Sequence, residues 1–245
     1  MLVILDSGHC EKVSGKRSPD NSFYEWKFNN EMQYKIKQRL EDHSIKVYLT
    51  NPSPSNKDEI GLTKRTDLAN NYWTKENKPK SLFISIHANA YGSDFNNARG
   101  TETYIASNAS NNSKNAAQLI NNSIFAAFKK LDSNAKNRGV KTNNFTVIHK
   151  ANMPSILVEY GFYTNKDDLN ILKNNKNELT EATIKGICEY FGIKYQEVVK
   201  KANTSENVFY RVVCGSYSNY ANAEAQVRNL ENKGIKNVFI DIYKK

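Results

Sequence analysis

Apolar residues follow two different spacings along most of the chain. Short runs rich in β-branched residues, each bounded by polar or turn-forming residues, predict strands over residues 2–5, 45–49, 82–86, 101–105, 145–148 and 156–158. Between them, apolar residues recur every three or four positions, which predicts helices over residues 28–40, 62–72, 116–128 and 178–190. This alternation predicts an α/β fold, in which a central mixed, mostly parallel sheet carries helices on both faces.

The pattern changes after Ile193, so we expect a first domain over residues 1–193. Residues 194–206 are mostly charged and polar, which predicts a linker. In the tail, residues 207–245, the pattern predicts strands over 208–213 and 238–242, a turn at 215–219 and a helix over 221–230. The tail is therefore expected to form a small α+β module.

Composition and charge exclude several classes of protein. Hydrophobic residues make up 39% of the 245 residues, enough for a sizeable core. The mean hydropathy of -0.69 and the absence of an apolar run near the roughly 20 residues that span a bilayer argue against a membrane protein. The formal net charge of +10 favours an anionic partner. Because Lys and Arg are scattered, we do not expect specific nucleic-acid binding, and the charge indicates solubility and long-range attraction to an anionic partner. No membrane partner is expected.

The cysteines and the N-terminus bear on the cellular compartment. Cys10, Cys188 and Cys214 are far apart and form no Cys-x-x-Cys pair, which argues against a disulfide framework and indicates a reducing compartment. The chain enters its first apolar run at Leu2 without the basic segment and cleavage site of a secretory signal. We therefore expect a protein made in the cytoplasm that reaches any external target by another route.

Three predicted strands lead into residues that can bind a metal or move a proton, namely His9, His87 and Glu159. In open α/β sheets the ligand crevice lies beyond the carboxyl ends of the strands, so these residues can converge. Glu25 lies three residues before Phe28, on the inward face of the first predicted helix. A carboxylate on such a face is costly unless it is paired or binds a metal.

Two imidazoles and one carboxylate, here His9, His87 and Glu25, form a familiar catalytic zinc set that leaves the fourth position for water. Glu159 would then act as general base beside that water and as general acid toward the leaving amine. Taken singly, each residue also suits a structural role. Either histidine can serve as a hydrogen-bonded side chain, and Glu25 can complement the helix dipole.

The other candidates near the site are less specific. Asp6 and Asn89 adjoin the histidines and suit either orientation of the imidazoles or simple turn hydrogen bonds. We expect His43 at the surface, and for His149 a structural role is favoured over a place in the same cleft. Cys10 follows the first histidine directly, and since adjacent side chains of an extended chain point to opposite faces, we do not expect its thiol at the metal.

Seven short segments are specific when taken together. They are Asp-Ser-Gly-His at 6–9, Glu with Phe-Asn at 25–29, Leu-Thr-Lys-Arg through Ala-Asn at 62–70, Ser-Ile-His-Ala-Asn at 85–89, Gly-Thr-Glu-Thr-Tyr at 100–104, Arg-Gly-Val at 138–140 and Pro-Ser-Ile-Leu-Val-Glu-Tyr-Gly-Phe-Tyr-Thr-Asn at 154–165. In order and context, residues 1 to about 192 resemble the zinc-dependent N-acetylmuramoyl-L-alanine amidases of the amidase-3 type.

The resemblance implies one zinc ion held by His9, Glu25 and His87, with Glu159 as the catalytic carboxylate. It implies cleavage of the amide bond between the lactyl group of N-acetylmuramic acid and the L-alanine of the stem peptide in bacterial peptidoglycan. The family usually has glycine after its first histidine, where this chain has Cys10.

The tail resembles the first half of a SPOR domain, a module that binds peptidoglycan glycan strands. The resemblance rests on Val-x-x-Gly-Ser-Tyr at 212–217 and Asn-Ala-Glu-Ala at 222–225. A half-module leaves an apolar helix face and a strand edge uncovered. We therefore expect residues 207–245 of two chains to pair as a homodimer, with the completed sheet in contact with the wall.

These features predict an endolysin or autolysin that reaches the wall after lysis or by a holin-type route. Two alternatives remain open. A zinc peptidase or carboxypeptidase acting within stem peptides would use the same metal chemistry, and a non-catalytic protein would bind walls without cutting them. The sequence does not distinguish a phage enzyme from a bacterial one, nor does it indicate a wall chemotype.

Overall fold

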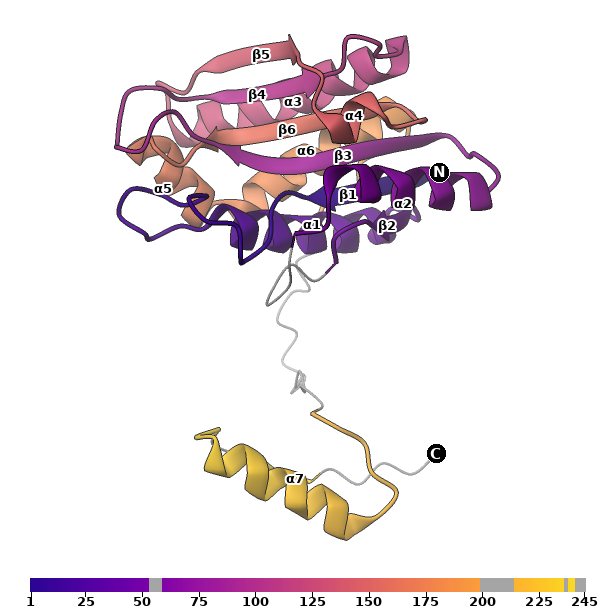
Figure 1. Cartoon of the computed structure of the whole chain (residues 1–245), viewed down its shortest axis with the longest axis vertical. Helices are drawn as coiled ribbons and strands as arrows, with labels where there is room; N and C mark the ends of the chain where they lie inside the picture. Colours follow the sequence, from indigo (N-terminus) through magenta and orange to yellow (C-terminus); the bar gives the residue numbers. More distant parts are fainter. Residues whose placement is uncertain (53–58, 199–213, 236–237, 241–245) are drawn as a thin grey trace. The chain divides into compact units, whose positions relative to one another are not determined.

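The computed structural model of the protein describes residues 1–52, 59–198, 214–235 and 238–240 (Figure 1). The chain forms two compact units, Met1–Glu197 and Val198–Lys245. The first unit extends beyond the predicted boundary at residue 193, because Tyr195 and Gln196 pack against it.

A six-stranded sheet forms the centre of the first unit, in the order β2-β1-β3-β6-β4-β5. The strands are β1 (Leu2–Ser7), β2 (Lys46–Leu49), β3 (Ser81–Asn89), β4 (Thr101–Ile105), β5 (Asn137–Thr142) and β6 (Ser155–Phe162). β1, β2, β3 and β6 are parallel, whereas β4 pairs antiparallel with β6 and parallel with β5. The mixed, mostly parallel sheet is confirmed. Because β4 and β5 run in the direction opposite to the other four strands, they begin at the edge of the sheet where β1, β3 and β6 end.

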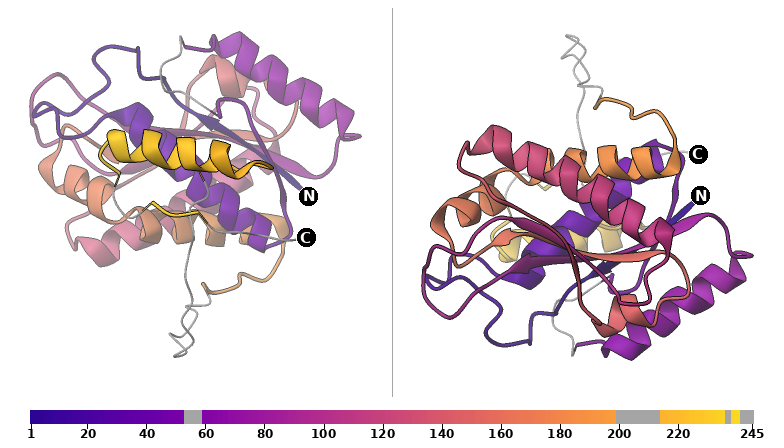
Figure 2. Two further views of the ribbon diagram at one scale, coloured as in Figure 1. Left: turned by 90° about the horizontal axis from the view of Figure 1, so that it is seen from below. Right: turned by 90° about the horizontal axis from the view of Figure 1, so that it is seen from above.

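Helices cover both faces of this sheet (Figure 2). One face carries α1 (Glu25–Asp42), α3 (Asn111–Leu131), α5 (Lys166–Asn174) and α6 (Lys176–Phe191), and the other carries α2 (Leu62–Lys75) and α4 (Thr146–His149). A hydrophobic core lies on each face of the sheet, and alternate strand residues point into one or the other. Val3 and Leu5 lie in the core under α1, α3, α5 and α6, and Leu2 and Ile4 lie in the core under α2 and α4. Burial of each such side chain contributes about 1.5–3 kcal/mol.

The predicted helices of the first unit are all present, but one predicted strand is wrong. Residues 145–148 include the start of helix α4, which turns Val147 and Ile148 into the second core. A short apolar run has no period long enough to separate a strand from a helical turn. Strand β5 was not predicted, because it is a largely exposed edge strand with few apolar residues. Helix α5 was also missed.

The second unit contains one described helix, α7 (Tyr220–Asn232), which confirms the helix predicted over 221–230. Asn219 caps it, since its side chain accepts a hydrogen bond from the Ala221 amide at 2.8 Å. Residues 238–240 form no strand, so that part of the predicted strand 238–242 is not confirmed. The strand predicted over 208–213 lies outside the described residues.

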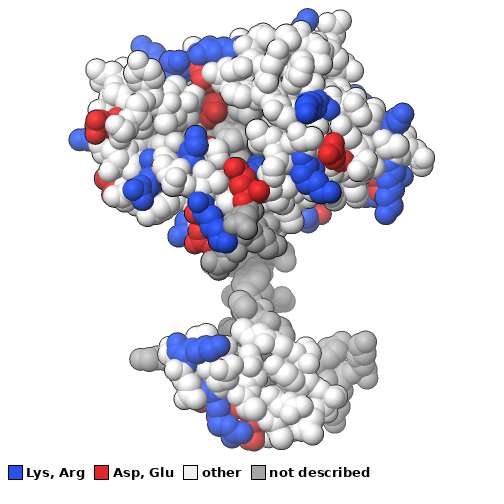
Figure 3. Space-filling view, viewed as in Figure 1, with Lys and Arg blue, Asp and Glu red and all other residues white. Residues whose placement is uncertain are grey.

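The surface of the first unit mixes charges of both signs. On the face that Figure 3 shows, Lys and Arg side chains are spread among acidic and uncharged residues rather than gathered in one stripe. Among the described helices, none combines the length and the apolar character that crossing a bilayer requires.

Candidate metal centre

His9, Glu25 and His87 meet at the edge where β1 and β3 end. Each offers one ligand atom, and the three atoms lie within 4.8 Å of one another. Oε1 of Glu25 is 3.0 Å from Nδ1 of His87 and 3.5 Å from Nε2 of His9. The Glu25 side chain is buried, whereas the imidazoles keep 18% and 16% of their side-chain surface exposed. The cluster therefore has a buried base and a side open to solvent.

The chain around His9 brings the two rings together. The two imidazoles are nearly perpendicular, with centroids 5.1 Å apart. Gly8 lies against the ring of His87, where an added Cβ would be 2.1 Å from Cε1. Asn29 donates to the Gly8 carbonyl at 3.0 Å and Asn51 donates to the His9 carbonyl at 3.0 Å. Only glycine fits at position 8, and two buried amides hold the turn that follows it.

Glu25 is the first residue of α1, and its carboxylate makes direct contacts with other side chains in addition to any interaction with the helix dipole. Its Oε1 also lies 3.3 Å from the Ala88 amide, which donates to it. Burial would raise the pKa of this carboxyl, but hydrogen bonds from His87 and His9 outweigh it and hold the pKa well below the usual range. The cluster therefore contains an ionised carboxylate between two imidazoles.

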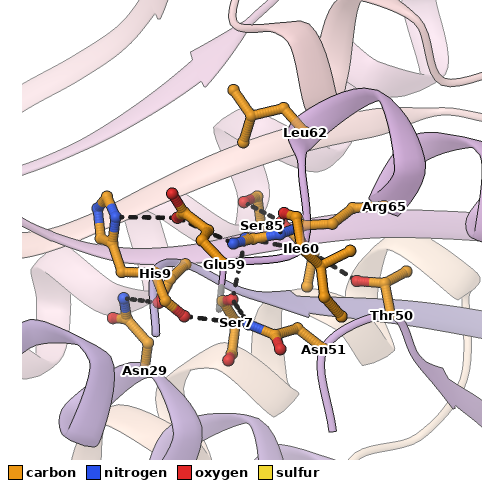
Figure 4. A network of polar contacts seen from close by, with 12 residues as sticks. Ser7, His9, Asn29, Thr50, Asn51, Glu59, Ile60, Leu62, Arg65 and Ser85 are labelled. Atoms are coloured by element: carbon orange, nitrogen blue, oxygen red, sulfur yellow. Dashed lines mark hydrogen bonds and ion pairs between the residues drawn. The ribbon is translucent and has the colours of Figure 1, made fainter. Parts of the chain in front are cut away.

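A buried arginine supports the far side of His9 (Figure 4). Arg65 of α2 is 1% exposed and donates to Oε1 of Glu59 at 3.1 Å and to the Ser7 carbonyl at 3.2 Å. Figure 4 shows Glu59 between this arginine and the ring of His9, whose Nδ1 is 3.5 Å from Oε1 of Glu59. The sequence analysis did not single out Glu59, and it named the segment that contains Arg65 without giving that residue a role. The available signal was a charged residue four positions before the buried Ala69, on the same helix face.

Asp6 and Asn89 make contacts other than those expected of imidazole partners. Asp6 is fully buried and accepts hydrogen bonds from Thr50 at 2.6 Å and Ser85 at 2.9 Å, and Arg65 lies 3.6 Å away. It thereby supports the arginine rather than a histidine. Asn89 donates to a carboxylate at 2.7 Å, that of Glu102, and not to a ring nitrogen.

Glu159 lies in β6 directly across from His87 of β3 and from Glu102 of β4. Its Oε2 atom is buried and has no hydrogen-bond partner in the described part of the chain. Burial, and then the negative charges of Glu25 and Glu102, raise the pKa of Glu159 well above its ordinary value. The structure thus places a buried carboxyl group with a raised pKa beside the group of possible metal ligands.

Glu102 and its cationic partners form a second feature to which the sequence analysis gave no role, although it named the segments that contain Glu102 and Arg138. The Glu102 side chain is 2% exposed and accepts hydrogen bonds from Tyr104 at 2.8 Å, Arg138 at 2.5 Å and Lys141 at 2.5 Å. Glu102 is the second residue of β4, Tyr104 lies two residues further along that strand, and Arg138 and Lys141 lie in β5. Because β4 runs antiparallel to β6, the start of β4 lies at the edge of the sheet that carries the site. In a fully parallel sheet, the start of β4 would lie at the opposite edge.

The remaining candidates lie outside the cluster. His43, expected at the surface, is buried, because Tyr195 stacks on its ring and the Gln196 amide donates to its Nε2 at 2.9 Å. His149 ends α4 and Cys10 is buried, and neither joins the described group of possible metal ligands. The described cysteines are all free.

Fold and site together define an α/β protein in which a candidate His-Glu-His metal centre lies beside a buried glutamate. The family model Amidase_3, described as N-acetylmuramoyl-L-alanine amidase, matches residues 3–189. The chain therefore belongs to the Amidase_3 family of N-acetylmuramoyl-L-alanine amidases. The matched residues include the whole cluster and end before the C-terminal unit.

Several known proteins are similar to this chain. The chain is 30% identical over 192 residues to the uncharacterised protein YqiI of Bacillus subtilis (strain 168), across 77% of this chain and 84% of that protein. It is 28% identical over 198 residues to the endolysin of Bacillus phage SPP1, across 79% and 67%. The catalytic domain of the amidase CwlV from Bacillus (Paenibacillus) polymyxa var. colistinus matches with a TM-score of 0.65 and 29% identity, across 79% of this chain and 99% of that domain.

Proposed function

We propose that this peptidoglycan hydrolase cuts the amide bond between N-acetylmuramic acid and L-alanine with one zinc ion held by His9, Glu25 and His87. Membership of the Amidase_3 family supports the choice of bond. The observation that carries the metal proposal is the approach of three ligand atoms to within 4.8 Å of one another.

The donor set suits zinc. Two imidazole nitrogens and one carboxylate oxygen are a ligand set of catalytic zinc sites, which keep a further position open. Glu25 is ionised and buried, with the two rings of His9 and His87 beside it, and a buried carboxylate favours a cation among its neighbours. Zinc bound there would polarise the scissile carbonyl and make a water molecule more acidic.

Glu159 is the proton carrier in this proposal. Its unpartnered Oε2 takes the proton of the attacking water and then delivers it to the nitrogen of L-alanine as the amide bond breaks. A carboxyl group whose pKa is raised by burial and by two neighbouring carboxylates can hold that proton between the two steps. Glu59 and Arg65 support His9 from behind, so the imidazole keeps Nε2 toward Glu25.

Product analysis tests the proposal. Digestion of purified cell walls should release stem peptides with free L-alanine amino termini, identified by mass spectrometry, and leave the lactyl groups on the glycan. A chelator should stop the reaction and added zinc should restore it. Cuts inside the stem peptide would indicate a peptidase instead, and binding without release would indicate a wall-binding protein.

The metal ligands can be tested separately by zinc content. His87→Ala should lose bound zinc and wall lysis together, whereas His149→Ala, a change of the same type outside the cluster, should keep both. Full zinc content in His87→Ala would show that the metal lies elsewhere, with His149 the next candidate.

The C-terminal unit, in the same proposal, pairs two chains and brings the enzyme to the wall as a SPOR-like half-module. In support, no residue of α7 is buried, and the apolar side chains of Tyr220, Ile235 and Phe239 are 60%, 49% and 68% exposed. Tyr220 and Phe239 line the same hollow, and contiguous exposed apolar side chains are typical of surfaces that bind a partner.

Release of the enzyme by lysis or by a holin-type pore completes the proposal. It is supported by the similarity to a phage endolysin. Fractionation of a producing culture tests it, since the enzyme should stay with intact cells and degrade their walls only after the membrane is permeabilised. Activity in the medium of intact cells would contradict this route.

A further inference from the structure

Two cationic side chains stand beside the proposed catalytic carboxyl group, and nothing in the proposed chemistry uses them. Arg138 and Lys141 of β5 both donate to Glu102, whose backbone is paired with that of Glu159. The Cα atoms of residues paired across antiparallel strands are about 4.5–5.5 Å apart. The cations are therefore anchored one strand away from the residue that carries the proton.

Glu102 does not account for all the hydrogen-bonding capacity of its partners. It also accepts hydrogen bonds from Asn89 and Tyr104, which fills the roughly four acceptor positions of a carboxylate. Within the described residues, Arg138 donates through Nε alone, so the two terminal nitrogens of its guanidinium group remain available. Its guanidinium carbon lies 4.9 Å from the centroid of the Phe162 ring, which restrains the group.

The group formed by Glu102, Arg138 and Lys141 also carries a net positive charge. Arg138 and Lys141 supply two positive charges, and Glu102 supplies one negative charge that is almost fully buried. The two cationic side chains keep 36% and 35% of their surface exposed. A restrained pair with one excess positive charge thus faces solvent next to Glu159, and it suits an anionic group on the substrate.

We propose that Arg138 and Lys141 form a subsite that binds a carboxylate of the stem peptide, on the residue that follows L-alanine. This inference rests on the proposed function. The terminal nitrogens of a guanidinium group match a carboxylate in a two-point hydrogen bond. One residue of extended peptide spans about 3.3–3.6 Å, so the residue after L-alanine lies within reach of a group one strand from Glu159. Glu102 acts as a positioning residue that holds both cations.

The subsite predicts a preference among substrates. Two probes differ in one group: N-acetylmuramoyl-L-alanyl-D-glutamate with a free α-carboxylate, and the same compound with that carboxylate as an amide. A hydrogen bond to a charged group contributes enough for roughly 10- to 100-fold. The wild-type enzyme should therefore show a kcat/KM ratio of acid to amide of that size, mostly through KM.

Variants of the holoenzyme test which residues create this ratio. Arg138→Gln should bring it close to 1, Arg138→Lys should retain part of it, and Lys141→Gln should lower it. Lys46→Gln is the matched control, because Lys46 also pairs with a glutamate, Glu76, at 2.6 Å but lies at the start of β2, on the opposite edge of the sheet. The control should keep the wild-type ratio.

The ratio separates substrate recognition from a structural role. If Arg138→Gln slows both substrates equally, the cations act only through Glu102 and the subsite is refuted. A wild-type enzyme that cuts both probes at the same kcat/KM refutes it as well. A wild-type enzyme that cuts neither probe contradicts the proposed function itself, and zinc content and the unfolding temperature show whether each variant has folded.

Discussion

The backbone of His9 shows how much of the site depends on single residues. Its φ of 64° lies in the left-handed region, which is uncommon for residues other than glycine. Such a conformation costs on the order of 1–3 kcal/mol. Hydrogen bonds from Asn29 to the Gly8 carbonyl and from Asn51 to the carbonyls of Ser7 and His9 offset that cost. The turn thereby directs the imidazole of His9 toward Glu25.

Gly8→Ala should weaken zinc binding although it removes no ligand. The new methyl group would lie within 2.5 Å of three atoms of the His87 ring, so the ring must move away from Glu25. Changes that displace a ligand in this way typically lower metal affinity by about 10- to 100-fold. Chelator competition measures the effect, and Gly61→Ala, whose methyl group would meet no atom within 4 Å, is the control. Equal zinc affinity in both variants would show that the ring of His87 does not bind the metal.

Glu159→Gln should keep the zinc and lose most turnover. Glutamine matches the side chain in shape but cannot accept the proton of water, and general acid-base catalysis contributes about 10²- to 10⁴-fold. Zinc content and wall digestion measure the two properties. Loss of zinc would instead make Glu159 a ligand, and unchanged turnover would refute its role as proton carrier.

The same variant should change the pH dependence of stability in the metal-free protein. Burial, with the charges of Glu25 and Glu102, raises the folded-state pKa of Glu159 well above 4.5. The unfolded chain releases this proton near pH 4.5 and the folded chain holds it, so the wild type loses stability as pH rises from 4.5 toward the folded pKa. Glutamine has no proton to release. Urea unfolding should show an advantage for the variant that is small below about pH 4 and grows with pH.

At the scale of elements, one buried acid joins α5 to the sheet. Asp168 is fully buried and accepts hydrogen bonds from the amides of Gly100 at 2.7 Å and Phe162 at 3.0 Å. Arg99 donates to its other oxygen at 3.2 Å. The helix begins at this point because the Asn165 side chain accepts from the amides of its first turn. The joint fixes the end of β6 and the chain that enters β4, so it sets how Glu159 faces Glu102.

Asp168→Ala should therefore destabilise the fold. It leaves two buried amides without an acceptor, at a cost of about 1–3 kcal/mol each. Urea unfolding measures the loss, and Asp167→Ala is a close control. Asp167 also pairs with Arg99, at 3.1 Å, but its side chain is 68% exposed, so its removal should change stability by less than about 1 kcal/mol. Equal losses in the two variants would contradict the importance of burial at this joint.

At the scale of the whole molecule, the compact unit that contains the site ends at Glu197. It contains the Amidase_3 match and the cluster, and its last residues cover the ring of His43. Truncation after Glu197 should leave zinc binding and the hydrolysis of soluble muramoyl peptides at wild-type levels. The cut must come after Gln196, because the Tyr195 hydroxyl donates to Glu181 at 2.5 Å and the Gln196 amide donates to His43.

The same truncation tests the role of the tail. Sedimentation should show the full-length chain as a dimer at micromolar concentration and the truncated chain as a monomer, and the truncated chain should bind purified walls more weakly. A monomeric full-length protein refutes the pairing. Equal binding to walls removes the targeting role but leaves the catalytic unit as described.

The sequence alone determined the features that depend on local spacing. Its two periods gave the strands that become β1, β3 and β6 and the helix α1, and the strand ends singled out His9, His87 and Glu159. Those three side chains meet because parallel strands end at the same edge of a sheet, so their convergence required no knowledge of long-range contacts.

Only the tertiary structure decided what surrounds these residues. The direction of β4 depends on its pairing with β6, some 50 residues further along the chain, and this antiparallel pairing places Glu102 beside Glu159. Likewise, the packing of α2 buries Arg65 behind His9, and the return of Tyr195 buries His43. Side-chain periodicity is a local property, whereas strand direction and burial depend on contacts between distant segments, so the sequence pattern showed the ligands and the fold supplied their neighbours.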